Sequence, residues 1–239
     1  MSFDRWRSLV DGAEIDVGSA IPDSGLAHQW NTDEGSGATL VDSNGGLDGT
    51  INGATWQSGA GTNNAYLDYD GVDDHTDLGE ESKSELSYLV GTTGSIGFWF
   101  NTSDDSRQVI MGNAFSSAEV CFGFRIRDDM NLGFTMSDGS EFDSIRGGTV
   151  PTNEWVFGGY RMDGSTRYLY INDTQVASQS IARSTTNDLT SDVVTIGDLG
   201  GEAGQDIFTG GIDIGFTGPT DIGDQGMKDW YSDTQEFYL

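Results

Sequence analysis

The stretch from Gln29 to Gly79 constrains the fold more than any other part of the chain. It contains, in order, the segments QWNTDEGSG, VDSNGG, GATW and LDYDGVDDHTDLG. Its glycine-, asparagine- and aspartate-rich segments have the composition of tight turns, and the residues between them have the length of short strands. This order predicts a succession of antiparallel strands joined by hairpins.

The composition of the chain agrees with a loop-rich β protein. The 239 residues include 35 glycines and 3 prolines, so many turn positions can adopt a positive φ. This length suits one large sandwich or two small domains, and one sandwich is the simpler interpretation. The single cysteine, Cys121, cannot form an intrachain disulfide. Its position between Val120 and Phe122 indicates a buried small hydrophobe.

Two further segments have the patterns of paired and buried strands. Ile96 to Phe100 is continuously apolar, as in a strand buried between two layers. Cys121 to Arg127 and Leu132 to Met136 alternate and predict a hairpin with one apolar face. The same alternation places Arg125 and Arg127 together on the opposite, solvated face.

The run from Trp155 to Gln179 predicts a three-stranded meander. Its sequence, WVFGGYRMDGSTRYLYINDTQVASQ, has turn signals at DGS and at ND. Alternation places Tyr168 and Tyr170 on one face of the sheet. Arg167 stands where an apolar residue would be usual and indicates a wetter sheet face.

Together these motifs resemble the laminin-G-like, concanavalin A-like jelly-roll family. The meander resembles the family pattern of a tryptophan strand, an Asp-Gly-Ser turn and a Leu-Tyr-Val-Asn-Gly strand, and FTGGIDIGF resembles its final strand. The resemblance implies an all-β sandwich of two antiparallel sheets over residues 25–218. Residues 1–24 would then form an N-terminal leader that docks on neighbours, and residues 219–239 an irregular C-terminal tail, with one short helix after Pro219 as an alternative.

The charge of the chain limits its partners and its surroundings. There are 39 acidic and 11 basic residues, giving a formal net charge of -28. Such a surface repels phosphate, which excludes nucleic acid and anionic membranes as partners. It suits a protein kept hydrated in molar salt and therefore indicates a halophilic source. The alternative is divalent-cation binding by clusters of carboxylates.

No catalytic motif is visible. The two histidines, His28 and His75, fit strand and turn positions, and the chain has no GxSxG elbow, zinc motif or P-loop. Glycosidases of this fold carry paired carboxylates on one strand, whereas Ile212-Asp213-Ile214 lacks the glutamates. We therefore expect a protein that is not an enzyme.

The resemblance implies one structural Ca²⁺ site. In the family, calcium often joins the loop after the opening strand to an aspartate of the final strand. Here Asp42 and Asp213 would bind by side chain, with oxygens of the loop from Asn44 to Asp48 completing the site. The alternative is that Asp42 forms an Asx-turn and Asp213 is a solvated strand residue. The acidic run from Asp70 to Asp77 is interpreted as a turn former.

Aromatic side chains are the usual platforms for sugars, but four of the tryptophans match core positions of the family. These are Trp30, Trp56, Trp99 and Trp155. Other candidates lie on the face of the meander that carries Tyr168 and Tyr170. If that face is open and concave, the remaining ligand-binding candidates are Tyr160, Tyr168, Tyr170, Arg125 and Arg127. The alternative is an aromatic ladder that only covers the sheet.

We therefore expect a non-catalytic recognition or adhesion module that binds glycan or a surface glycoprotein. The opening segment, SFDRWRSLVDGAEIDVGSAIPDS, resembles structural proteins of haloarchaeal tailed viruses, lacks an apolar secretory signal and is followed by no membrane-spanning run. This predicts a homo-oligomeric turret, decoration or tail-fibre protein at a virion or extracellular surface in high salt, bound to other subunits through the leader.

Two other functions remain open at this point. One is a purely structural capsid or tail cementing subunit without a sugar site. The other is a secreted glycoside hydrolase of the concanavalin-like fold, which would require a pair of carboxylates in a cleft.

Overall fold

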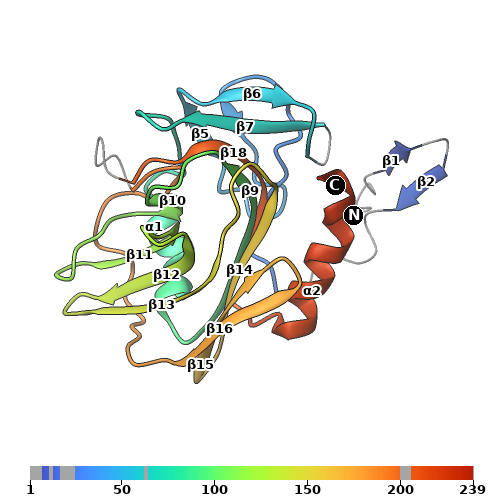
Figure 1. Cartoon of the computed structure of the whole chain (residues 1–239). Coiled ribbons are helices and arrows are strands. Elements are labelled where there is room, and N and C mark those ends of the chain that lie inside the picture. The colour runs from blue at the N-terminus through green and yellow to red at the C-terminus, as the bar shows by residue number, and fades with distance from the viewer. Residues whose placement is uncertain (1–6, 11–12, 17–24, 62–63, 200–205, 239) are drawn as a thin grey trace.

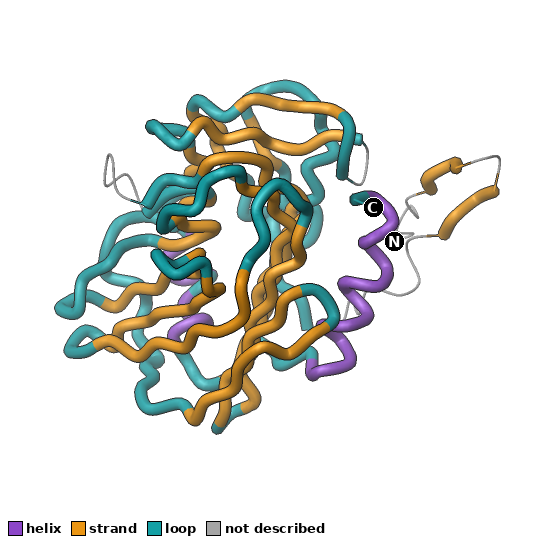
Figure 2. Tube along the Cα trace, viewed as in Figure 1, coloured by secondary structure: helices purple, strands orange, loops and turns teal. Residues whose placement is uncertain are grey.

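The computed structural model describes residues 7–10, 13–16, 25–61, 64–199 and 206–238. Two antiparallel sheets pack face to face, and a C-terminal helix lies on the outer face of one of them (Figures 1 and 2). This arrangement confirms the all-β jelly-roll sandwich that the sequence predicts.

Sheet 1 contains the meander and the buried strand that the sequence predicts. Its hydrogen-bonded order is β16-β15-β14-β9-β18-β7-β6, and β3 also pairs with β18. Its strands are β3 (His28–Trp30), β6 (Thr55–Ser58), β7 (Ala65–Asp70), β9 (Thr93–Thr102), β14 (Val156–Asp163), β15 (Thr166–Ile171), β16 (Thr174–Ser180) and β18 (Thr209–Gly218).

Sheet 2 contains the predicted 121–136 hairpin and the short strands of the opening stretch. Its order is β13-β12-β11-β10-β17-β8-β5-β4. Its strands are β4 (Thr39–Leu40), β5 (Gly49–Asn52), β8 (His75–Asp77), β10 (Gln108–Gly112), β11 (Val120–Ile126), β12 (Asn131–Asp138), β13 (Phe142–Thr149) and β17 (Thr195–Ile196).

The remaining elements are short. They are the antiparallel pair β1 (Arg7–Val10) and β2 (Ala13–Asp16), the helical segment of α1 (Ser82–Glu85) and η1 (Ser87–Val90), and the C-terminal helices α2 (Gly223–Thr234) and η2 (Gln235–Phe237). The predicted leader over residues 1–24 lies mostly outside the described residues, so its docking role stays a prediction. Within the described part of the chain, no helix has the length and apolar character needed to cross a membrane.

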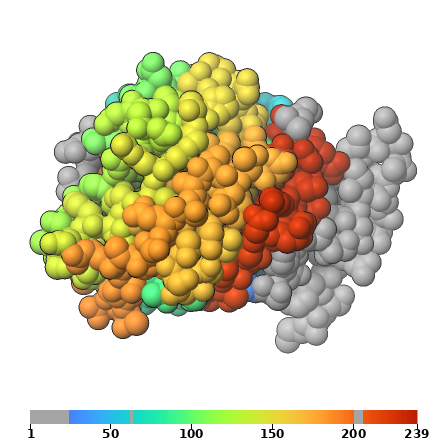
Figure 3. All heavy atoms as spheres, turned by 60° about the horizontal axis from the view of Figure 1, so that its bottom comes forward, coloured from blue at the N-terminus to red at the C-terminus, as the bar shows by residue number. Residues whose placement is uncertain are grey.

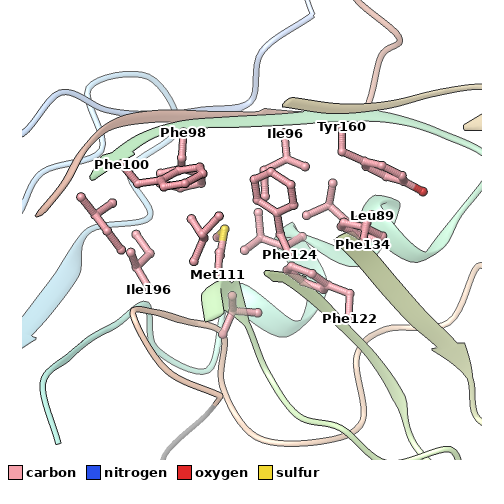
Figure 4. Close-up of a cluster of buried hydrophobic side chains, with 14 of the residues drawn as sticks. Leu89, Ile96, Phe98, Phe100, Met111, Phe122, Phe124, Phe134, Tyr160 and Ile196 are labelled. Atoms are coloured by element: carbon pink, nitrogen blue, oxygen red, sulfur yellow. The ribbon is translucent and has the colours of Figure 1, made fainter. Parts of the chain in front are cut away.

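The core lies between the two sheets and follows from the alternation of their strands. Ile96 and Phe100 of β9 point inward with Phe98 because residues two apart share a face of a strand. Burying each such side chain contributes about 1.5–3 kcal/mol to folding. Figure 4 shows these residues facing the inward side chains of sheet 2 and of η1, among them Met111, Phe122, Phe124, Phe134, Ile196 and Leu89.

The C-terminal segment forms a helix that packs on sheet 1, which corrects the prediction of an irregular tail. Met227, Trp230 and Thr234 of α2 are buried at helical spacing. The Trp230 ring lies 6.0 Å from that of Phe157 and 4.6 Å from that of Phe216. Figure 3 shows α2, in red, directly beside the orange strands of the meander. The alternative of a short helix in this segment is the one that the structure shows.

Candidate functional site

Tyr160 is a core residue, so its prediction as a ligand-binding residue is wrong. It lies opposite Leu169 in the pairing of β14 with β15, and Leu169 points into the core. The Tyr160 ring stacks on Phe134 of sheet 2, with ring centroids 3.9 Å apart, and is fully buried. Cross-strand partners share a face, and this pairing therefore separates Tyr160 from Tyr168 and Tyr170.

Tyr168 and Tyr170 do lie together on the outer face of sheet 1, but the C-terminal segment closes that face. The guanidinium of Arg161 lies 3.8 Å above the Tyr168 ring, and its Nε donates to the Tyr170 hydroxyl at 2.9 Å. Asp221 accepts from Arg161 at 3.0 Å, and Asp224 of α2 accepts from Tyr170 at 3.1 Å. Burial raises the pKa of Tyr170 to about 12. This arrangement agrees with the alternative that these aromatic side chains form a ladder covering the sheet. It leaves Tyr170 without access to a ligand.

Arg125 lies on β11 of sheet 2 and Arg127 directly follows that strand, so they cannot share a site with the tyrosines. Arg125 is 2% exposed, which corrects the prediction of a solvated side chain. Its guanidinium lies 3.7 Å from the Phe115 ring centroid, and its Nη2 donates to the Thr135 hydroxyl at 3.3 Å. Its Nε is buried without a hydrogen-bond partner among the described residues. Burial, with repulsion from Arg127, lowers the pKa of Arg125 to about 9.

Phe115 and Phe142 form an exposed aromatic pair above Arg125. Phe115 belongs to residues 113–119, which connect β10 to β11, and Phe142 begins β13. Their rings stack with centroids 4.8 Å apart and planes inclined by 22°. They are 39% and 40% exposed, and they are two of the four large apolar side chains exposed in the described part of the chain. Since burying such rings is favourable, an exposed stacked pair marks a surface suited to a ligand.

Polar groups continue from this pair along the outer face of β13. Phe142, Ser144 and Arg146 alternate with buried Asp143 and Ile145. At about 3.3 Å per residue, the Cα atoms of Phe142 and Arg146 are about 13 Å apart along the strand. One face of a single strand therefore presents an apolar ring, a hydroxyl and a guanidinium in line.

Three arginines converge around Gly133 of β12. Gly133 pairs with Arg125 on one side and with Arg146 on the other. The side chain of Arg127 lies over the same glycine, because its Cγ is 3.3 Å from where a Cβ of Gly133 would stand. We call Phe115, Phe142, Ser144, Arg127 and Arg146 the Phe–Arg surface. Sequence reasoning found Arg127 but missed the other four.

The loop predicted to bind calcium is closed by hydrogen bonds within the protein. His28 Nδ1 lies 2.7 Å from Asp42 Oδ2. Burial alone would raise the pKa of Asp42, but this hydrogen bond and those from the loop hold it well below its ordinary value. The carboxylate also accepts from the backbone N–H groups of Gln29, Asn44, Gly45 and Leu47 at 2.8–3.0 Å.

These contacts leave the predicted ligands a poor fit for Ca²⁺. Five donors fill the roughly four lone-pair positions of the Asp42 carboxylate. Asn44 donates to the Leu26 carbonyl at 3.0 Å, and Asp48 accepts from the Asp42 N–H at 2.9 Å. Asp213 is 1% exposed, not solvated, and accepts from the Tyr238 hydroxyl at 2.6 Å. The Asx-turn alternative therefore describes Asp42 better than metal ligation.

Carboxylates also lie close together in the β7–β8 hairpin. Asp70, Asp73 and Asp74 place carboxylate oxygens within 4.8 Å of one another, but Asp70 and Asp74 each accept backbone N–H bonds of their own hairpin. This agrees with the prediction of turn formers. A hollow of about 310 Å³ is lined by Asp48, Asp77, Glu81 and neighbouring loop residues. Asp77 there accepts the Gly79 N–H at 2.7 Å.

Solved structures share this fold. Domain 4 of AbnA, a GH43 extracellular arabinanase from Geobacillus stearothermophilus solved in complex with arabinotriose, aligns with a TM-score of 0.66 and 15% identity over 86% of this chain and 97% of that domain. The receptor-binding domain of botulinum neurotoxin C/D mosaic serotype aligns with a TM-score of 0.64 and 16% identity over 88% of this chain. The chain spans 51% of that toxin domain, about half its length. At these identities the likeness shows the fold alone.

The sequence comparison identifies the family. No curated protein matches the chain in sequence. The laminin-G family described as the concanavalin A-like lectin/glucanases superfamily matches residues 70–214, which is more than half of the chain. These residues run from the end of β7 to the middle of β18 and include strands of both sheets. The chain therefore belongs to the laminin-G-like branch of the concanavalin A-like lectin/glucanase superfamily.

Proposed function

We propose that the chain is a non-catalytic carbohydrate-recognition module that binds through the Phe–Arg surface. The observation that carries the proposal is the exposed, stacked pair of Phe115 and Phe142, with Ser144 and Arg146 in line beside it. Flat rings suit the apolar faces of sugars, while a hydroxyl and a guanidinium can bond their oxygens. The structure of the similar AbnA domain with arabinotriose supports sugar binding by this fold.

The carboxylates around this surface support recognition rather than glycoside hydrolysis. A glycosidase needs two carboxyl groups flanking the scissile bond, one of them protonated. Asp138 and Glu141 both bind the guanidinium of Arg183, and Asp129 binds Arg146 at 3.1 Å. Ion pairing favours the charged form of a carboxylate, so these groups are poor proton donors.

The proposed setting is an assembly exposed to high salt, and specifically a haloarchaeal virion. The net charge of -28 supports this setting, because screening in molar salt removes the repulsion that such a charge causes. As a turret, decoration or tail-fibre subunit, the domain would present the Phe–Arg surface to a host glycan or glycoprotein. Residues 1–24 would bind neighbouring subunits.

A glycan array probed in molar salt tests the proposed function. We expect the wild-type chain to bind at least one oligosaccharide, and Phe115→Ala with Phe142→Ala to weaken binding at least tenfold, about 1.4 kcal/mol. Val72→Ala is the matched control, because Val72 is exposed on the β7–β8 hairpin, away from the surface. Equal binding by the double variant, or no binding by the wild type, would contradict the proposal and favour a structural cementing role.

A further inference from the structure

We infer that the oligosaccharide recognised by the Phe–Arg surface carries a carboxylate, as uronic acids do; this inference rests on the proposed function. The first observation is the distribution of arginines. Four of the seven whose side chains are described lie on or beside this face of sheet 2, in a chain of net charge -28. They are Arg107, Arg125, Arg127 and Arg146.

Arg127 and Arg146 lack firm anionic partners at the surface. Arg127 forms no ion pair with any described residue. Arg146 pairs with Asp129 at 3.1 Å, but their side chains are 60% and 44% exposed, so the pair is weak and open to exchange. A ligand carboxylate can therefore replace Asp129 on Arg146 and supply Arg127 with a counterion.

The buried guanidinium of Arg125, below the Phe–Arg surface, also favours the binding of an anion here. Among the described residues, Arg125 forms one ion pair: the Asp206 carboxylate lies 3.8 Å from its Nη1 and also binds Arg107 at 2.6 Å. Burial and repulsion from neighbouring cations disfavour the charge of Arg125, which is why its pKa is depressed. An anion held by Arg127 and Arg146 would stabilise all three cations.

The spacing along β13 sets the size of the ligand. With Phe142 and Arg146 about 13 Å apart, one sugar ring can pack against the exposed phenylalanine pair while a neighbouring ring reaches the arginines. Exposed Ser144 lies between them, and because its hydroxyl donates to Thr135 at 2.9 Å, it can act toward a ligand only as an acceptor. The guanidinium fork matches a carboxylate in two parallel hydrogen bonds. The ligand is thus an oligosaccharide of at least two rings.

The overall negative charge does not prevent such binding in high salt. The Debye length falls to about 3 Å in 1 M salt, so the field of distant carboxylates is screened while direct contacts persist. A polyanion such as nucleic acid would extend beyond this patch and meet the acidic surface. A neutral sugar would supply no counterion to Arg127.

Calorimetry with matched ligands tests the inference. Trimers of galacturonate and of mannuronate, each compared with its methyl ester, are titrated into the full chain in 1 M salt, because the ester keeps the shape and removes the charge. We expect at least one uronate to bind tenfold more tightly than its ester. Arg127→Gln or Arg146→Gln should abolish that preference, while Lys228→Gln, which removes an exposed cation on α2, should not.

The outcomes separate the inference from the proposed function. If neutral or esterified sugars bind as tightly as uronates, and the arginine variants bind normally while Phe115→Ala with Phe142→Ala does not, the carboxylate inference fails and carbohydrate recognition stands. If no oligosaccharide binds, or the phenylalanine variant binds normally, both fail. Thermal unfolding of each variant establishes that it is folded.

Discussion

Arg167 of β15 and Asp143 of β13 form an ion pair between the two sheets, and both side chains are buried. This corrects the prediction that Arg167 marks a wet face. The pair also orients β13. Phe142 and Ile145 are three residues apart and cannot both face inward on a strand, so one of them must be exposed. With Asp143 bonded to Arg167, β13 places Ile145 in the core and Phe142 outside.

The Arg167–Asp143 pair is therefore expected to control stability. Asp143→Ala leaves a buried guanidinium without its carboxylate and should lower the free energy of unfolding by about 3–5 kcal/mol. Asp129→Ala, which breaks the exposed pair with Arg146, is the control and should change the free energy of unfolding far less, because solvent screens that pair. Urea unfolding at constant salt measures both. Similar losses for the two variants would show that the buried pair has no special role.

Trp230 is expected to hold α2 on sheet 1. Trp230→Ala removes a fully buried ring packed on Phe157 and Phe216 and should cost about 3–5 kcal/mol. The exposed Gln225 on the same helix serves as the control, with little change for Gln225→Ala. Binding of a fluorescent apolar dye should rise in the tryptophan variant alone. Unchanged unfolding would mean that α2 is not part of the folded unit.

Asp42 gives stability a defined pH dependence. Its folded-state pKa lies below the unfolded value near 3.9, so its contribution is present above about pH 4 and is lost as the pH falls toward the folded-state value. Asp42→Asn should lower the free energy of unfolding by about 2 kcal/mol at pH 6. The difference from wild type should shrink below pH 4. A constant difference down to pH 2.5 would contradict this account.

Calcium and salt are expected to act differently on the chain. Because the Asp42 carboxylate is filled by protein donors, removal of calcium by a chelator should leave the melting temperature unchanged. Raising the salt from 0.1 to 2 M should increase it, since the net charge of -28 is then screened. A melting temperature insensitive to salt but lowered by the chelator would restore the predicted calcium site and remove the argument for a halophilic protein.

The sequence by itself determined the fold class and much of the strand pattern. The apolar run from Ile96 to Phe100, the 121–136 hairpin and the 155–179 meander all appear as strands. Their signals are local, because alternation and turn residues act over two to ten positions. Cys121, Trp30 and Trp99 are buried as expected, while Trp56 and Trp155 are only partly so.

The tertiary structure decided which faces are open. The tyrosine face of sheet 1 is covered by a helix more than 50 residues away along the chain, and Arg125 is covered by Phe115 from a connecting loop. The exposure of Phe142 depends on Asp143 meeting Arg167 across the sandwich, 24 residues later. A slip of β13 by one residue would move every one of its side chains to the opposite face of the sheet. Local periodicity cannot encode that choice, because it depends on a contact between the two sheets.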